Sequence, residues 1–168
     1  NDLAGFNTVQ IRAITTADVK ALTTDQVVAL NSVQFAGVTT SQIQALNTDQ
    51  IAAIDTTDLR ALSTVQIQAL TTEQAASLTT EQVANLTTAQ ARAIETNDLR
   101  AMGTDQIAAL ESTQAAALTT AQINGLGTHQ IAAIETNDLR AMSTVQIAAI
   151  STVQAPALTS DQMQALTT

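Results

Sequence analysis

The chain has 168 residues, of which 45% are apolar, enough to form a packed core in water. It has no Cys, so disulfide bonds, thiolate metal sites and a Cys nucleophile are excluded. The formal charge of −9 argues against nucleic acid as a partner, because clustered Lys and Arg bind a phosphate backbone. No apolar run approaches the roughly 18 residues of a transmembrane helix, so we expect no insertion into a membrane.

An octapeptide repeat runs through the whole chain. Every eighth residue from Phe6 to Leu166 is apolar, and a second apolar column runs from Leu3 to Met163. The consensus is Leu-Thr-Thr-x-Gln-Ile-x-Ala, with no gap or insertion, and self-similarity at a fixed period is the signature of a solenoid. The sequence therefore predicts a single repeat array over residues 1–168. Because the chain starts in mid-octad and stops where another unit would begin, we expect a fragment of a longer array.

Each octad carries the start signals of a helix. With Thr23 as the N-cap, Gln26 falls at position N3, which gives a capping box. Leu22 and Val27 then occupy N′ and N4, the two positions of the hydrophobic staple. An alternative register places the cap on Thr24; it explains why that column is always Thr or Ser but loses both the box and the staple. We prefer the first register.

The positions of the charges agree with this register. All fifteen acidic residues fall at the N-cap, N2 or N3, and all six Lys and Arg residues fall at N5. A helix favours negative charge at its N-terminus and positive charge at its C-terminus. The acidity is therefore explained as capping chemistry, and no acidic binding surface is needed to account for it.

Two other architectures are excluded by the eight-residue spacing. In one continuous helix an apolar column would precess by about 80° per octad, so no buried stripe would survive. In a β-solenoid the two apolar columns, three residues apart, would fall on opposite faces of the strand. The fold class is therefore all-α: a solenoid or superhelix of about twenty short Thr-capped helices.

A forty-residue period lies over the octads. The segment Ile54–Leu62 recurs, with small changes, as Ile94–Met102 and Ile134–Met142. In the marked octads Asp replaces Gln at N3, at Asp18, Asp58, Asp98 and Asp138. Our hypothesis is that five helices complete one superhelical turn, so that residue i stacks on i+40. Salt bridges between successive turns would then join Asp58 to Lys20, Asp98 to Arg60 and Asp138 to Arg100. The alternative is that forty residues is only a unit of gene duplication.

The sequence shows no candidate catalytic, cofactor-binding or metal-binding residues. His129 is the only histidine and is expected to be a solvated surface residue, since no carboxylate, Cys or Ser partner lies near it in the sequence. The many Thr and Ser residues have no base to activate them, so they are interpreted as caps. We therefore expect no enzyme, cofactor or metal, with a hydrolase as a distant alternative. Regular Thr ranks also suggest an ice-binding surface, a remote alternative because capping already explains them.

The run Ala69–Val83, with its many copies, resembles the Ala-Leu-Thr-Thr-x-Gln-Ile-x-Ala-Leu arrays of very large bacterial secreted proteins of the adhesin or haemolysin-like kind. The resemblance implies a structural spacer or scaffold, with an adhesive role as a further option, outside the cell or on its surface. Its partners would be an unknown protein or surface ligand and the adjacent repeats of the parent chain. The calcium-binding Gly/Asp-rich nonapeptides of such proteins are absent. The rival function is an intracellular protein-recognition solenoid.

Overall fold

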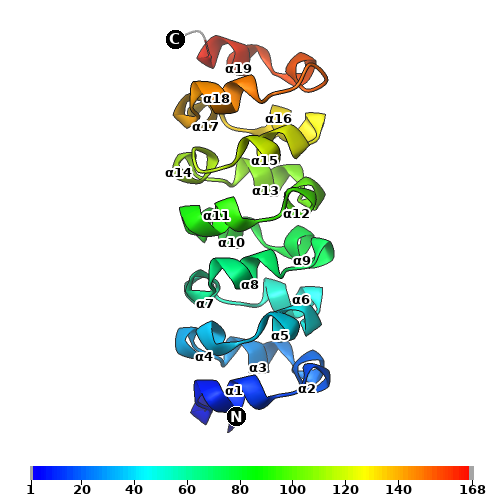
Figure 1. The fold of residues 1–168 in the computed structure, drawn as a ribbon, viewed down its shortest axis with the longest axis vertical. Helices are drawn as coiled ribbons and strands as arrows, with labels where there is room; N and C mark the ends of the chain where they lie inside the picture. Colours follow the sequence, from blue (N-terminus) through cyan, green and yellow to red (C-terminus); the bar gives the residue numbers. More distant parts are fainter. Residues whose placement is uncertain (1, 167–168) are drawn as a thin grey trace.

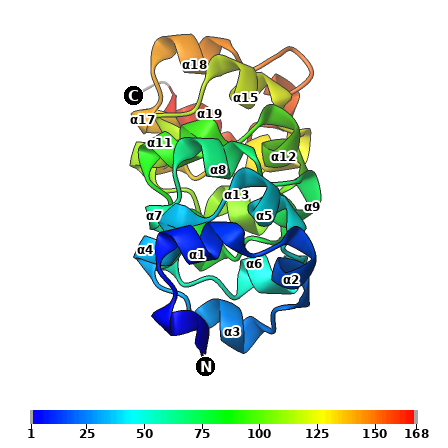
Figure 2. The same ribbon diagram turned by 60° about the horizontal axis from the view of Figure 1, so that its bottom comes forward.

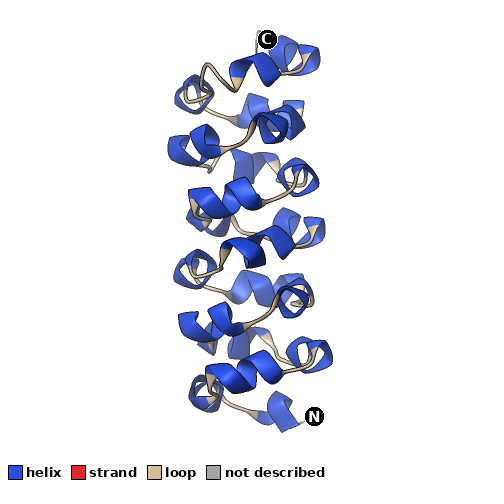
Figure 3. Cartoon of the chain, turned by 90° about the vertical axis from the view of Figure 1, so that its right-hand side faces the viewer, coloured by secondary structure: helices blue, strands red, loops and turns tan. Residues whose placement is uncertain are grey.

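In the computed structural model, which describes residues 2–166, the chain winds into a rod-shaped superhelix of short helices (Figure 1). Among these residues there are α-helices and two short 3-10 helices, η1 (Asp2–Gly5) and η2 (Ala155–Ala157), but no strand (Figure 3). The α-helices are α1 (Thr8–Ala13), α2 (Thr16–Ala21), α3 (Thr24–Val28), α4 (Ser32–Gly37), α5 (Thr40–Ala45), α6 (Thr48–Ala52), α7 (Thr56–Ala61), α8 (Thr64–Gln68), α9 (Thr72–Ser77), α10 (Thr80–Asn85), α11 (Thr88–Ala93), α12 (Thr96–Ala101), α13 (Thr104–Ala108), α14 (Ser112–Ala115), α15 (Thr120–Gly125), α16 (Thr128–Ala133), α17 (Thr136–Ala141), α18 (Thr144–Ala148) and α19 (Ser160–Ala165).

The preferred capping register is confirmed. Helix α3 begins at Thr24, and the Thr23 hydroxyl accepts the backbone N–H of Gln26 at 3.2 Å. In return the Thr23 backbone N–H donates to Gln26 Oε1 at 2.8 Å, which completes the capping box. The glutamine half of the box persists where the cap residue has no hydroxyl, since the Gly103 N–H donates to Gln106 Oε1 at 2.7 Å. Where N3 is Gln, its side chain therefore closes the cap whether or not the N-cap residue has a hydroxyl.

The two apolar columns meet on the axis of the rod. Residues of the N4 column such as Ile43, Ile51 and Val83 are fully buried, and the apolar column that runs from Phe6 to Leu166 packs with them in one continuous core. Figure 2, in which the lower end comes forward, shows α1, α2 and α3 following one another around this axis. The chain thus changes direction once in each octad, and each octad contributes its large side chains to a shared core.

Successive turns are joined by the amide of the N3 glutamine. Gln82 Nε2 donates to the carbonyls of Ile51 and Ile54, each at 2.8 Å, while its Oε1 accepts the Thr79 N–H of its own helix. Ile51 lies in the last turn of α6 and Ile54 follows its C-cap Ala53, a region where carbonyls have few partners within the helix. The same pair of bonds, to the residues 31 and 28 positions earlier, is made by Gln34, Gln42, Gln50, Gln66, Gln74, Gln90, Gln106, Gln114, Gln122, Gln130, Gln146, Gln154 and Gln162.

The prediction of five helices per turn is wrong. Each glutamine reaches the octad four units earlier, whereas each helix packs against the helix three units earlier, as α4 does on α1 and α12 on α9. One turn therefore takes between three and four octads, and α1, α8 and α15 recur along the middle of the view in Figure 1. The turn is tighter than five octads because the N3 glutamine amide bonds to carbonyls only 31 and 28 residues earlier. The array makes about six turns, a rod on the order of 60 Å long at about 10 Å per turn.

The forty-residue period is therefore not the superhelical turn. The marked octads hold α2, α7, α12 and α17, which alternate between the right and left sides of the rod in Figure 1. Residue i does not stack on i+40. Gene duplication stays a prediction for the origin of this period.

Substituting Glu for Gln82 tests the inter-turn bonds. A carboxylate keeps the acceptor of the capping box but cannot donate to the Ile51 and Ile54 carbonyls, and Gln82 is only 2% exposed. Because the variant buries a charge against two carbonyl oxygens, we expect Gln82→Glu to lower the free energy of unfolding by about 3–5 kcal/mol at neutral pH. Urea unfolding followed by circular dichroism measures this.

Gln10→Glu is the matched control. Gln10 makes the same box with the Asn7 N–H at 2.9 Å, is exposed, and bonds to no carbonyl of another turn among residues 2–166. The same chemical change there should alter stability by no more than about 0.5 kcal/mol. Equal losses in the two variants would mean that the inter-turn bonds contribute nothing.

Candidate functional site

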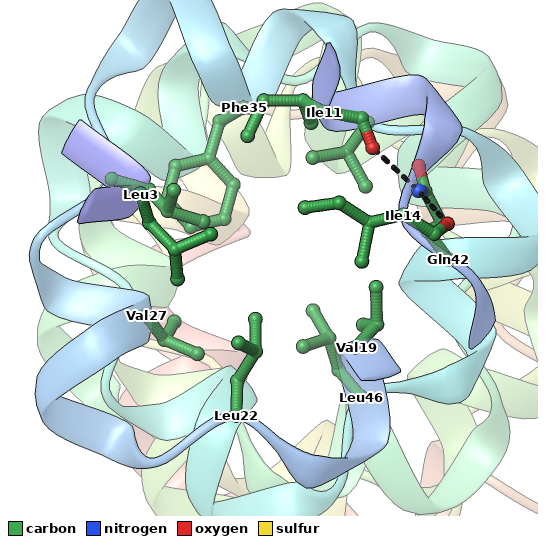
Figure 4. A pocket seen from close by; sticks show the side chains of 11 residues that line it. Leu3, Ile11, Ile14, Val19, Leu22, Val27, Phe35, Gln42 and Leu46 are labelled. Atoms are coloured by element: carbon green, nitrogen blue, oxygen red, sulfur yellow. Dashed lines mark hydrogen bonds between the residues drawn. The ribbon is translucent and has the colours of Figure 1, made fainter. Parts of the chain in front are cut away.

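The cavity found inside the rod is too small for a ligand. That cavity, near the N-terminal end of the axis, has a volume of about 20 Å³ and is lined by apolar side chains such as Leu3, Val27 and Phe35 (Figure 4). A void of this size holds at most about one water molecule, and apolar walls keep it dry. The polar Gln42 in its wall donates to the Ile11 and Ile14 carbonyls. The surface available to other molecules is therefore the outer one.

The aspartates that replace Gln at N3 form a second kind of inter-turn bond. Asp58, Asp98 and Asp138 are buried, and each accepts a hydrogen bond from a hydroxyl 26 residues earlier. The pairs are Ser32 with Asp58 at 2.7 Å, Thr72 with Asp98 at 2.8 Å and Ser112 with Asp138 at 2.7 Å. The predicted salt bridges from Asp58, Asp98 and Asp138 to Lys20, Arg60 and Arg100 are wrong, because partners 38 residues apart are more than one turn apart.

Asp138 has the least favourable surroundings of the three. It is 3% exposed, and its Oδ2 has no hydrogen-bond partner among the described residues. Burial raises the pKa of Asp138; the hydrogen bond from Ser112 opposes this, and the carboxylates of Glu135 and Glu111 raise the pKa further. The hydroxyl–Asp pair recurs at forty-residue intervals with the same geometry. We interpret it as a structural contact of the array.

The structure places His129 where the sequence predicted, exposed at N2 of α16. Within residues 2–166 no three or more His, Cys, Asp or Glu side chains gather in a group that could hold a metal ion. No helix in this part of the chain is long and apolar enough to cross a bilayer, since the longest have six residues. The absence of catalytic, cofactor and metal sites stays a prediction.

The N2 and N5 columns lie on the outer surface, together with most residues of the N-cap and N1 columns. Five valines at N2 are strongly exposed, between 60% and 74%: Val9, Val33, Val65, Val145 and Val153. Side chains at N5 donate to carbonyls 25 residues later, as Arg12 Nε does to Gly37 at 3.1 Å and Arg60 Nη1 to Asn85 at 3.3 Å. Residue types vary from octad to octad in both columns, but the sequence alone could not show which of their members lie side by side, because that depends on the number of octads per turn.

Asp138→Asn tests the electrostatics of the buried aspartate. Because the pKa of Asp138 is raised above its unfolded value, the folded chain binds more protons, and stability rises as pH falls through the folded pKa. At pH 7 the charged carboxylate therefore destabilises the fold. We expect the neutral Asn, whose Oδ1 can still accept from Ser112, to raise the melting temperature at pH 7. The gain should shrink as pH falls and vanish well below the ordinary Asp pKa of 3.8, where the carboxyl is protonated in both states.

Asp25→Asn serves as the control for this change. Asp25 is exposed at N2 of α3, where its charge favours the helix N-terminus, so the substitution should lower stability slightly, by about 0.3–0.5 kcal/mol. Melting curves at both pH values compare the two variants. A lower melting temperature for Asp138→Asn at pH 7 would contradict the assigned direction.

Comparison with known families agrees with the repeat. Residues 1–32, 51–88, 92–128 and 131–168 match the family model of the ALTTAQ repeat, and residues 117–122 spell that hexapeptide. None of the curated proteins compared with the chain is similar enough to count as a match. In structural terms the hexapeptide holds the buried Leu118, the N-cap Thr119 and the N3 Gln122, so the family motif coincides with the residues that close the cap and join the turns. Because the matched stretches make up most of its length, the chain belongs to the ALTTAQ repeat family and is a structural repeat module.

Proposed function

We propose that this module is a spacer and scaffold of a bacterial secreted or cell-surface protein. The observation that carries the proposal is the inter-turn bonding of the N3 glutamines, which repeats with the same partners along the rod. An array built this way grows in length with each added octad and keeps one cross-section. Reach that scales with repeat number is what a spacer needs.

The rigidity of the rod supports the same function. Every turn is held to the next by buried glutamine or aspartate side chains and by a continuous apolar core. Even residues 151–157, where Pro156 lies and no α-helix forms, keep the bonds from Gln154 to Ile123 and Leu126. A local irregularity therefore does not interrupt the rod. The extracellular or surface setting, and an added adhesive role of the N2 and N5 columns, rest on the resemblance to arrays of large secreted proteins.

The rival function is an intracellular protein-recognition solenoid. Recognition solenoids bind partners on an extended concave surface that follows from a small rotation per repeat. Here each octad turns the chain by a large angle and the axis is filled by the core, so the interior offers no such surface. The ice-binding alternative also loses support, since hydroxyls such as those of Thr39 and Thr71 accept backbone N–H groups of their own helices.

Deleting residues 64–119, seven octads and two turns, tests the spacer function. The cut joins Ser63 to Thr120 in register, so Gln122 takes the place of Gln66. Because turns are spaced by about 10 Å, we expect the maximum dimension in small-angle X-ray scattering to fall by about 20 Å, with the cross-section unchanged. A shortened chain that unfolds, or a rod of altered width, would contradict an array whose length is set by repeat number.

A second experiment tests the setting. Antibodies raised against the rod should label intact cells of the organism that makes the chain. Labelling that appears only after the cells are opened would overturn the surface setting and favour the intracellular rival. The scattering result is independent of this outcome.

A further inference from the structure

Helices from successive turns form rows along the rod. Helix α1 packs against α4, α8 against α11 and α15 against α18. Between these pairs, glutamines of α8 and α15 bond to carbonyls of α4 and α11, through Gln66 to Phe35 and Gln122 to Ala91. The row α1–α4–α8–α11–α15–α18 therefore runs from one end of the rod to the other by alternate steps of three and four octads (Figure 1).

This row carries exposed apolar side chains and no acidic residue. Its octads contain none of the fifteen Asp and Glu residues of the chain. Arg12 and Arg92 lie on it at N5, both exposed, and the guanidinium of Arg92 makes no hydrogen bond with the described residues. We call it the valine row, after its N2 residues Val9, Val33, Val65, Ala89, Ala121 and Val145.

A second row has the opposite character. Helix α3 packs against α6, α10 against α13 and α13 against α16. Gln82 of α10 bonds to α6, and Gln162 of α19 bonds to Ile131 of α16. The octads of these six helices contain no Lys or Arg. We call this the acidic row, after its exposed N2 residues Asp25, Asp49, Glu81, Asp105 and Asp161, with His129 on α16.

The two rows lie on opposite sides of the rod. Five of the six acidic-row helices begin sixteen residues after a helix of the valine row, as Thr24 follows Thr8, Thr48 follows Ser32 and Thr80 follows Thr64. The exception is α16, which begins eight residues after α15 and so lies to one side of the acidic face. Sixteen residues are two octads, which is somewhat more than half of a turn, because one turn takes between three and four octads. The rod therefore has one apolar, partly basic face and one acidic face, a pattern that is scattered and invisible along the sequence.

The two-faced pattern does not come from the forty-residue period. At forty-residue steps the N2 column reads Asp25, Val65, Asp105 and Val145, alternating between acid and apolar. Forty residues are about one and a half turns, so such steps lead to opposite sides of the rod. The buried N3 column keeps Asp at the same spacing, at Asp58, Asp98 and Asp138. The exposed column thus follows the superhelix, while the buried column follows the sequence repeat.

We propose that a second copy of this chain docks alongside the first, with the valine row of one rod against the acidic row of the other. Charge complementarity selects this occupant, because Arg12 and Arg92 would face carboxylates, and covering the valines removes an apolar stripe from water. Both rows run along the rod in steps of three and four octads, so two parallel rods can bring them together over several turns. The contact joins two different faces, so it does not close and builds sheets or bundles of rods. It goes beyond the spacer function and does not depend on where the protein acts.

Sedimentation velocity from micromolar to millimolar concentration tests the association. We expect the mass of the chain to rise with concentration and the rise to weaken in high salt, which screens the charge pairs. Small-angle scattering should show particles that become wider without becoming longer. A chain that stays monomeric at every concentration, or particles that only lengthen by end-to-end stacking, would overturn the proposal.

A double substitution on the valine row tests the surface itself. Val33→Glu with Val65→Glu places carboxylates against the acidic row of the partner and should weaken association by about tenfold or more. The matched control is Ala17→Glu with Thr57→Glu, which makes the same change at exposed N2 positions of α2 and α7, outside both rows. Circular dichroism checks that both variants fold. Equal weakening in the two pairs would mean that total charge, and not the valine row, governs association.

A complementary variant tests which rows meet. Asp49→Lys with Asp105→Lys reverses charge on the acidic row, and alone it should associate about tenfold more weakly. Mixed with the Val33→Glu/Val65→Glu chain, it should form mixed assemblies, because glutamates on one rod then face lysines on the other. A mixture that stays as dispersed as its separate components would overturn the pairing of these two rows.

Discussion

The side-chain amide of the N3 glutamine makes hydrogen bonds at the ends of two helices: the N-terminus of its own helix and the C-terminus of a helix one turn earlier. A helix of six residues has few internal hydrogen bonds, so most of its backbone N–H and C=O groups need partners elsewhere. In Gln82 the Oε1 atom accepts an N–H at the start of its own helix, and Nε2 donates to two carbonyls at the end of a helix one turn earlier. Neither Glu, which cannot donate, nor Asn, which is one methylene shorter, provides this combination. The very short helices of this fold depend on that side chain.

The same bond determines the shape of the superhelix. The glutamine connects octads four units apart, while the apolar faces of helices pack three units apart, as in α1 and α4. A turn that satisfies both contacts takes a non-integer number of octads, so no residue column runs straight along the rod. Where Asp replaces Gln, its shorter side chain accepts from a hydroxyl 26 residues away, as Asp58 does from Ser32, and the pitch is kept. Two different side chains thus support one geometry.

Local features of the fold could be predicted from the sequence, and long-range ones could not. The N-cap at Thr23 and the box with Gln26 follow from rules that involve neighbouring residues only, and both are confirmed. The number of octads per turn depends on which carbonyls the Nε2 atom of Gln82 reaches while its Oε1 atom accepts the capping hydrogen bond. The capping rule concerns Oε1 only and does not predict the partners of Nε2. The recurring Asp58 segment suggested a turn of forty residues because a repeat in sequence was equated with a neighbour in space. For the same reason the valine row could not be recognised before the turn was known.

The structure separates two kinds of constraint on the octad. Buried columns must fit the cap, the axis and the inter-turn bonds, so every octad uses nearly the same residues there. The N2 and N5 columns face outward and satisfy no such requirement, since Asp25 and Val65 occupy equivalent helix positions equally well. If exposed positions were filled only by capping preference, acids would be spread evenly around the rod, because every helix has the same positive N-terminus. Their confinement to octads away from the valine row therefore reflects a requirement of the outer surface. A requirement that follows the superhelix acts on the folded rod, which is the form that meets other molecules.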